Sequence, residues 1–470
     1  MRQEQTGSQN IAMIPLHFSF FVSFFALSFG FAFARQFLIS HVNVALFSLD
    51  SPTILISLPI SVAGIAIGIF LGSWLTLQSG RKILIQSSSI FGMGAFLASC
   101  VAPNLSVYIT SYFVLGLTLG LYLLAALMYI AEIALPIQRG IALSYIPTMF
   151  MAGIFLALPL QYFNEISELL PFLVAYVILN LIFLLLFYIK VPESPRWLSL
   201  VGLSDSSLNV LFKLRLNMGL AAHELAVIND SVRHNIRGAT LFFQNNNFRQ
   251  VMWFYSLFAI LLHLSGVSFF PIILSLYMTN ALEYDQVFSC NLKECIFYAM
   301  IFAMVLAALI NTLFIERVGR RKLLLISATS NCIMLFLIWV FFLTIGHNNN
   351  YLTLMVLSIV YVFTATLSAC VFLSCFVDIA PTCARDFCVS AILFIFVTSI
   401  LLMIRVLFDY HLYLSFSNLV LIFSIFAFIF VIVIKKFFPD TNDLSLEEIE
   451  SHIFDGRKVR LIGNNIKDNY

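Results

Sequence analysis

The chain has 470 residues, of which 61% are hydrophobic and 10% are charged, and its mean hydropathy is +0.99. This composition is more apolar than the core of a soluble domain requires, so it excludes a soluble protein and predicts one that crosses a membrane many times. The formal net charge of +2 gives no indication of a nucleic-acid partner, and we expect none.

Twelve stretches of about 20 apolar residues are long enough to cross a bilayer. They begin near Pro15, Thr53, Leu84, Val107, Ile141, Leu170, Val251, Ile296, Lys322, Tyr351, Val389 and Leu412. Six precede and six follow a polar segment at residues 196–249. We therefore predict an all-α membrane protein, with an N-terminal six-helix bundle at residues 15–191, a helical linker at residues 192–249 and a C-terminal six-helix bundle at residues 250–436.

Lys and Arg gather near both ends of the chain, in the linker and in alternate loops. Loops rich in these residues stay in the cytosol, so we expect the linker and both terminal tails, residues 1–14 and 437–470, to be cytosolic. The start of the chain has no signal-peptide pattern, which predicts that the first span is an uncleaved helix. Cys290 and Cys295 share one external loop, where they either form a disulfide or remain free thiols.

The linker alternates apolar and polar residues at helical spacing, which indicates several short amphipathic helices. They form either a cytosolic collar that braces both bundles or a solvated connection between them. Another helix is expected after Ser445, because a serine followed by acidic residues is a helix-start signal.

One sparse set of charged motifs occurs once in each half of the chain. The motifs are SGRK at residues 79–82, repeated as VGRRK at 318–322; an acid followed by an arginine at 132–139, repeated at 378–385; and PESPR at 192–196, repeated as PDTN at 439–442. The offsets are similar, 319 − 80 = 239 and 385 − 139 = 246. A duplicated bundle explains this spacing, and parallel repeats of hydrophobic helices with a site between them are typical of secondary transporters.

These motifs resemble those of the sugar porter family of the major facilitator superfamily, which includes facilitated glucose and trehalose transporters. The resemblance covers roughly residues 15–450 and includes LSG at residues 264–266 and LEEI at residues 446–449. It implies two pseudo-symmetric six-helix bundles that give alternating access to a central cavity between them. The sequence has no phosphate-binding glycine loop, metal-ligand spacing or nucleophile with a matching base, so we expect neither an enzyme nor a cofactor.

In sugar porters, charged residues at the motif positions lock the cytosolic side in the outward-facing state and separate in the inward-facing state. The resemblance assigns this role to Arg81, Lys82, Glu132, Arg139, Glu193, Arg196, Glu316, Arg320, Arg321, Asp378 and Arg385. We expect the arginines of each bundle to pair with the acids of the same bundle. The alternative is that these charges are static anchors that fix topology, but acids contribute little to topology. The family pattern has an acid three positions before the first motif's glycine, where this chain has Leu77, so the first lock is expected to be looser or to depend more on Glu132.

The substrate site departs from the family. Span seven normally carries two adjacent glutamines where this chain has Leu262 and His263, and three other usual sugar contacts correspond to Ser268, Pro147 and Leu373. The remaining candidates for substrate contact are His263, Ser265, Gly266, Ser268, Asn311, Thr148 and Gln161. His263 has three interpretations: a core histidine bonded to a neighbouring carbonyl, a substrate ligand or a proton-linked group.

Sugar symporters of the family generally place an aspartate in span one, whereas residues 11–39 of this chain contain no acid. We therefore expect facilitated diffusion of a hexose or small disaccharide, in the plasma membrane by family analogy. Arg35 and Arg405 are cations at membrane depth that snorkel or pair, Arg405 for example with Asp409. If instead they face the cavity, an organic anion is the alternative substrate. A non-transporting sugar sensor is the alternative from another functional class.

Overall fold

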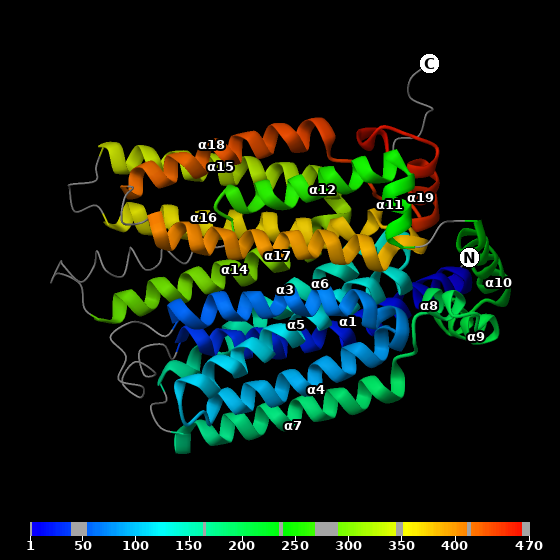
Figure 1. Cartoon of the computed structure of the whole chain (residues 1–470), viewed down its shortest axis with the longest axis horizontal. Coiled ribbons are helices and arrows are strands. Elements are labelled where there is room, and N and C mark those ends of the chain that lie inside the picture. Colours follow the sequence, from blue (N-terminus) through cyan, green and yellow to red (C-terminus); the bar gives the residue numbers. More distant parts are fainter. Residues whose placement is uncertain are drawn as a thin grey trace.

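The computed structural model describes residues 2–38, 54–162, 166–234, 238–267, 290–344, 351–410 and 415–462. Throughout these ranges the chain is helical, without strands, and its long helices lie side by side along the longest axis of the molecule (Figure 1). The long helices of the first half are α1 (Arg2–Leu38), α3 (Ile54–Ser79), α4 (Arg81–Cys100), α5 (Leu105–Ile133), α6 (Arg139–Leu156) and α7 (Ile166–Lys190). Those of the second half are α12 (Asn246–Leu264), α14 (Cys290–Val318), α15 (Arg320–Thr344), α16 (Tyr351–Cys375), α17 (Arg385–Tyr410) and α18 (Phe416–Phe437).

Eleven of these helices, among the described residues, are long and apolar enough to cross a membrane. They correspond to eleven of the twelve predicted spans. The remaining predicted span starts within α12, which ends at Leu264, shortly before residues 268–289 that lie outside the described part. α1 begins at Arg2, so its helix also includes most of the expected N-terminal tail. Cys295, near the start of α14, is a free and exposed cysteine.

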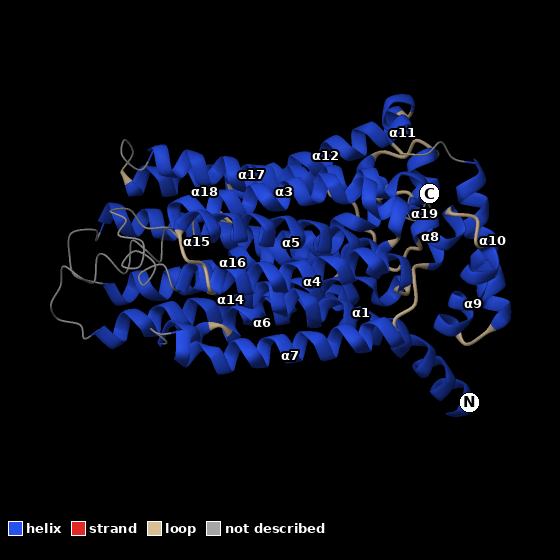
Figure 2. Cartoon of the chain, turned by 60° about the horizontal axis from the view of Figure 1, so that its bottom comes forward, coloured by secondary structure: helices blue, strands red, loops and turns tan. Residues whose placement is uncertain are grey.

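Short helices gather at one end of the molecule. They are α8 (Pro195–Leu200), α9 (Ser204–Arg215), α10 (Met218–His234), α11 (Ala239–Gln244) and α19 (Leu446–Phe454). Figures 1 and 2 both place them at the end where α1 begins, and we call this end the linker end. The 3-10 turns are η1 (Pro136–Gln138), η2 (Leu158–Tyr162), η3 (Phe376–Ile379), η4 (Thr382–Ala384) and η5 (Val459–Leu461).

Glycines allow helices of the first half to approach backbone to backbone. A methyl group added to Gly68 of α3 would overlap the carbonyl oxygen of Leu117 in α5, and one added to Gly153 of α6 would overlap that of Leu27 in α1. Small residues at such positions let membrane helices pack closely where the hydrophobic effect between helices is weak.

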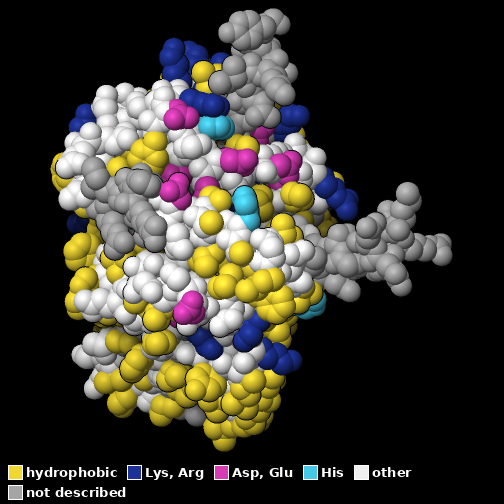
Figure 3. Space-filling view, turned by 90° about the vertical axis from the view of Figure 1, so that its right-hand side faces the viewer, with side chains coloured by type: hydrophobic (Ala, Val, Ile, Leu, Met, Phe, Trp, Pro, Cys, Tyr) yellow, Lys and Arg dark blue, Asp and Glu magenta, His cyan; other side chains and the backbone are white. Residues whose placement is uncertain are grey.

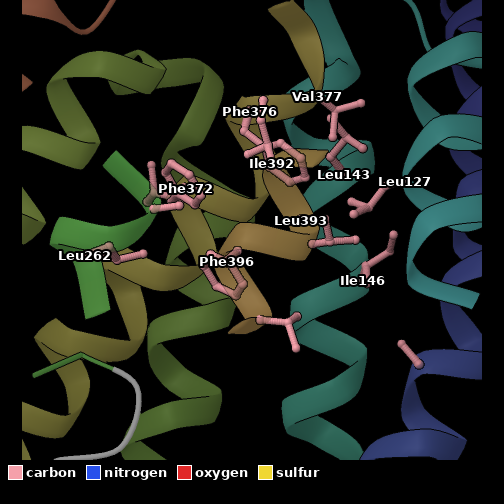
Figure 4. Close-up of a cluster of buried hydrophobic side chains, with 14 of the residues drawn as sticks. Leu127, Leu143, Ile146, Leu262, Phe372, Phe376, Val377, Ile392, Leu393 and Phe396 are labelled. Carbon is pink, nitrogen blue, oxygen red and sulfur yellow. The ribbon is translucent and has the colours of Figure 1, made fainter. Parts of the chain in front are cut away.

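The two halves meet along α3 with α17, and along α6 with α14 and α16. Part of this interface is an apolar layer of buried side chains. Figure 4 shows Leu127, Leu143 and Ile146 of the first half opposite Val377 and Leu393 of the second. In this conformation the halves are therefore packed together near the linker end, where the charged motifs lie.

Candidate functional site

Each half places a buried arginine against a buried acid at the linker end. Arg81, the first residue of α4, lies with Nη2 3.2 Å from Oε1 of Glu132 near the end of α5. In the second half Arg320, the first residue of α15, pairs in the same way with Asp378 of η3. Each arginine follows a glycine with positive φ, 84° at Gly80 and 93° at Gly319, a conformation that residues with a side chain rarely adopt. The repeated glycine is thus what turns the chain between the two helices of each motif.

A second pair of arginines joins the halves. Nη1 of Arg139 lies 3.5 Å from Oδ1 of Asp378, and Nη1 of Arg385 lies 3.4 Å from Oε1 of Glu132. The expectation that arginines pair within their own bundle is therefore wrong for these two residues. The reason is local: Arg139 starts α6 and Arg385 starts α17, and these helices pack against the opposite half.

Glu316 also connects the halves. Its Oε1 accepts a hydrogen bond of 2.5 Å from the backbone N–H of Gly140 in the first turn of α6, and it lies 3.0 Å from Nη2 of Arg320. A carboxylate beside the N-terminus of a helix is favourable because the unpaired N–H groups there carry partial positive charge.

Most of these charged groups are almost inaccessible to solvent. The arginines Arg81, Arg139, Arg320 and Arg385 are at most 2% exposed. Figure 3 looks onto the linker end, where other Lys, Arg, Asp and Glu side chains are scattered among hydrophobic ones. Removing one partner of a buried ion pair typically costs about 3–5 kcal/mol, so the network holds the halves together only while every charge keeps its partners.

The third repeated motif supplies helix caps. Oε1 of Glu193 accepts hydrogen bonds of 3.1 Å from the backbone N–H groups of Arg81 and Lys82. Burial raises the pKa of Glu193. In the second half Oδ1 of Asn442 accepts the N–H of Arg320 at 3.2 Å, so the weaker second copy of the motif keeps the capping role with an amide.

The C-terminal segment adds two acids that were not among the predicted gate residues. Glu447 of α19 lies with Oε1 2.6 Å from Nη2 of Arg196, and Oε2 of Glu450 accepts the N–H of Thr382 at 3.0 Å. Because Arg196 belongs to α8, this ion pair holds α19 against the helical linker between the two halves. A capping box at Ser445 starts α19 as expected from the sequence, but no sequence signal identified the partners of its acids.

The side chains of two predicted gate residues form no ion pair with the acids described above. Nζ of Lys82 donates to the carbonyl of Tyr188 at 2.9 Å, and Nη2 of Arg321 donates to that of Lys435 at 2.9 Å, both at exposed positions. The expectation that Arg321 meets an acid of the second bundle is wrong in this conformation. The accepting carbonyls lie in the last turns of α7 and α18, where carbonyls without a partner in the helix attract basic side chains.

Two predicted substrate residues instead join the halves. Asn311 of α14 donates through Nδ2 to Ser144 of α6 at 3.1 Å and to Ser374 of α16 at 3.2 Å. Oγ1 of Thr148 lies 2.8 Å from Oγ1 of Thr312. We call these five residues the polar seam. Since Asn311 is fully buried, the seam closes the interface in this conformation.

The three predicted residues at the end of α12 are engaged in packing. Oγ of Ser265 donates to a carbonyl of the preceding turn at 2.7 Å. Gly266 has a φ of 78°, and its carbonyl accepts the hydroxyl of Tyr361 at 2.8 Å. The ring of His263 is buried, with its centroid 4.3 Å from that of Phe396.

The side chains of two further substrate candidates lie outside the described part of the chain. Ser268 lies outside the described residues, and for Gln161 the description covers only the backbone, in η2. Among the described candidates, the structure therefore brings Thr148 and Asn311 together in the seam, while Ser265 and Gly266 bond to other residues and His263 packs against Phe396.

The cations at membrane depth differ in their surroundings. Arg35 is buried, donates through Nη1 to Oγ of Ser99 at 3.4 Å and lies 6.0 Å from the ring centroid of Phe96. Both neighbours belong to α4, so Arg35 is directed into the first half rather than toward the second. Arg405 is exposed on α17.

The chain is similar over most of its length to known transporters. It is 25% identical over 412 residues to the galactose-proton symporter of Escherichia coli, which covers 85% of this chain and 86% of the relative. It is 26% identical over 410 residues to the major myo-inositol transporter of Bacillus subtilis, which covers 83% of each chain.

The fold matches that of a solved member of the major facilitator superfamily. The proton:xylose symporter XylE bound to 6-bromo-6-deoxy-D-glucose superposes with a TM-score of 0.77 at 19% identity, covering 95% of this chain and 99% of that chain. This agreement confirms the predicted all-α major facilitator fold. The family model described as "Sugar (and other) transporter" matches residues 12–453, so the chain belongs to this family of membrane transporters and is not an enzyme.

Proposed function

We propose that this protein carries a hexose or a small disaccharide across a membrane by alternating access, and that the linker end faces the cytosol. The observation that carries the proposal is the exchange of partners between the halves, Arg139 with Asp378 and Arg385 with Glu132. Ion pairs between two bundles must separate if the bundles part at this end. The conformation described here is then the one in which the cytosolic side is closed.

A sugar is the substrate that the family and the named relatives favour. The relatives are named as transporters of galactose and of myo-inositol, both of which are polyhydroxylated and uncharged. The direction of Arg35 into the first half argues against the alternative substrate, an organic anion, because that cation is not aimed at the interface between the halves.

Facilitated diffusion is supported by where the acids lie. Within the eleven candidate spans the only acidic residues are Glu132, Glu316, Asp378 and Asp386, and all four belong to the charged network at the linker end. Acids inside a membrane protein often mark proton relays, and the acids of these spans are instead paired with arginines at the linker end. The galactose relative is named a proton symporter, so coupling is the point on which this chain is proposed to differ.

Counterflow of radiolabelled glucose in proteoliposomes tests the function. We expect uptake that is competed by unlabelled galactose, is insensitive to an imposed pH gradient and is unaffected by an organic anion such as citrate. Uptake that follows the pH gradient would overturn facilitated diffusion and would direct attention to His263. Absence of flux for glucose, galactose, myo-inositol and trehalose in folded, inserted protein would favour the sensor.

Orientation is tested separately. Both termini are proposed to be cytosolic and the membrane to be the plasma membrane. An epitope inserted after α19 should react with antibody in permeabilised cells and not in intact cells.

A further inference from the structure

The two copies of the first charged motif differ at one position that matters for the gate. Glu316 lies three residues before Gly319 and holds the start of α6 through the N–H of Gly140. The equivalent position in the first half is Leu77, since 316 − 77 = 239 and 319 − 80 = 239. Leu77 is 50% exposed, and its side chain can neither accept a hydrogen bond nor balance an arginine.

The residue that Glu316 contacts in the opposite half, Gly140, also differs from its equivalent in the other interface. Gly140 follows Arg139 in α6, and the residue that follows Arg385 in α17 is Asp386. Oδ1 of Asp386 lies 3.2 Å from Nη2 of Arg81, and its side chain is 8% exposed. One interface has an acid at position 316 of α14 and a glycine at position 140 of α6. The other interface has a leucine at position 77 of α3 and an acid at position 386 of α17.

Both altered residues line the same groove. A groove of about 540 Å³ runs between α3, α8, α11 and α17, and its lining includes Leu77, Asp386, Trp74 and Trp197. Position 77 therefore faces the region that Asp386 reaches from the other half. The room beside Leu77 is sufficient for a longer polar side chain to approach the start of α17.

The charge balance of the network depends on this exchange. In the second motif's group, Arg139 and Arg320 are in contact with two acids, Glu316 and Asp378. In the first motif's group, Arg81 and Arg385 both contact Glu132, so without a further acid two buried arginines would share a single acid in direct ion-pair contact. Asp386 supplies that second acid.

We propose that Asp386 takes over, from the opposite half, the role of the acid that is missing at Leu77, and is a positioning residue of the gate. The proposal rests on the alternating access proposed above. Arg81 is then held by Glu132 of its own half and by Asp386 of the other half, and it loses Asp386 each time the halves part at the linker end. The first lock is consequently not weaker than the second, because its second acid comes from α17 of the opposite half instead of from α3.

Moving the acid back to its motif position tests the proposal. The reporter is a cysteine introduced at Ser144, a fully buried residue of the polar seam that becomes accessible to a thiol reagent when the linker end opens. The purified full-length protein is labelled in lipid nanodiscs, and the labelling of the same variant without the reporter is subtracted. We expect Asp386→Gly to raise the labelling rate by about tenfold, within the range typical of coupling between two conformations.

The rescue separates a gate role from mere structural damage. Leu77→Glu combined with Asp386→Gly rebuilds the pattern of the second interface and should return labelling to within about twofold of the parent, a small difference on the tenfold scale. Leu77→Gln combined with Asp386→Gly has nearly the same shape without the charge and should not. Equal labelling of the parent and Asp386→Gly, or rescue by the glutamine as complete as by the glutamate, would overturn the proposal.

The same experiment distinguishes this proposal from the function on which it rests. Labelling needs no substrate, so its result can be interpreted even if the proposed sugar substrate is wrong. If even Arg139→Gln fails to expose position 144, the halves do not part at this end and alternating access itself fails. If Arg139→Gln exposes it and Asp386→Gly does not, only the role of Asp386 is rejected.

Discussion

Arg139 and Asp378 lie 3.5 Å apart although 239 residues of chain separate them. Because one belongs to the start of α6 and the other to η3, their contact crosses from the first half to the second. The reciprocal contact of Arg385 with Glu132 gives the interface the two-fold character of the duplicated sequence. A conformational change that opens this end has to break both.

Arg139→Gln should favour opening of the linker end. It removes the contacts of Arg139 with Asp378 and with the carbonyl of Leu444, while Asp378 keeps Arg320, so folding should survive. We expect labelling of a cysteine at position 144 to rise about five- to tenfold, a typical size for such a coupling. Lys82→Gln is the matched control, because Lys82 belongs to the same motif but its amine contacts only Tyr188 of its own half, through the carbonyl and the ring. An equal effect of both substitutions would contradict a specific role for the exchanged pairs.

Gly140→Ala should disturb the gate by displacing Glu316. A methyl group at position 140 would lie 2.5 Å from Oε1 of Glu316, which must then leave the start of α6. We expect slower glucose counterflow and faster labelling at position 144. Gly94→Ala provides the comparison, since a methyl group there meets nothing within 4 Å. Unchanged counterflow in Gly140→Ala would show that the Glu316 contact is dispensable.

Gly68→Ala should destabilise the first half without acting on the gate. The added methyl group overlaps the carbonyl of Leu117, so α3 and α5 must move apart. Overpacking of this kind costs about 1–3 kcal/mol, which thermal unfolding of the detergent-solubilised protein should reveal as a lower midpoint. Gly94→Ala is again the control, and a midpoint equal to that control would contradict the close helix packing described here.

The contact between Glu447 and Arg196 should set a response to acid. Burial opposes ionisation of Glu447, but the charge of Arg196 and other neighbours outweighs it and lowers the pKa of Glu447 below its usual 4.5. A carboxylate with a lowered pKa contributes stability that is present above its usual pKa and is lost as the pH falls through the lowered one.

The expected measurement is the difference in unfolding midpoint between the parent and Glu447→Gln. It should stay constant from about pH 7 to pH 5 and shrink only below about pH 4, because the pair stays ionised until then. A difference that already disappears between pH 7 and pH 5 would mean that the carboxylate of Glu447 takes up its proton above its usual pKa of 4.5 and is not held as an anion by Arg196.

The sequence was sufficient to predict the fold and to mark most of the charged residues that meet at the linker end, because a duplicated motif marks which positions are equivalent. Their role as a gate stays a prediction. It did not show that Arg139 and Arg385 exchange partners, since equivalence says nothing about which half a side chain reaches. Asp386 was missed because it lies outside every motif, although the missing acid at Leu77 was a signal that a substitute should exist.

The substrate candidates were predicted less well for a physical reason. Polar residues inside a membrane protein either bind a ligand or satisfy neighbouring helices, and the sequence does not distinguish the two. Thr148 and Asn311 are in the polar seam, and Ser265 is bonded to its own helix. Their direct contact with substrate remains a proposal that depends on the halves parting.

The most direct test of the account is a reversible cross-link across the polar seam. Oγ of Ser144 lies 3.3 Å from Oγ of Ser374, so cysteines at both positions can form a disulfide between the halves, with Cys375 replaced by serine to prevent alternative pairing. We predict that oxidation abolishes glucose counterflow, that dithiothreitol restores it, and that neither single-cysteine variant responds. Full counterflow in protein shown to be completely cross-linked would contradict transport by separation of the two halves at this end.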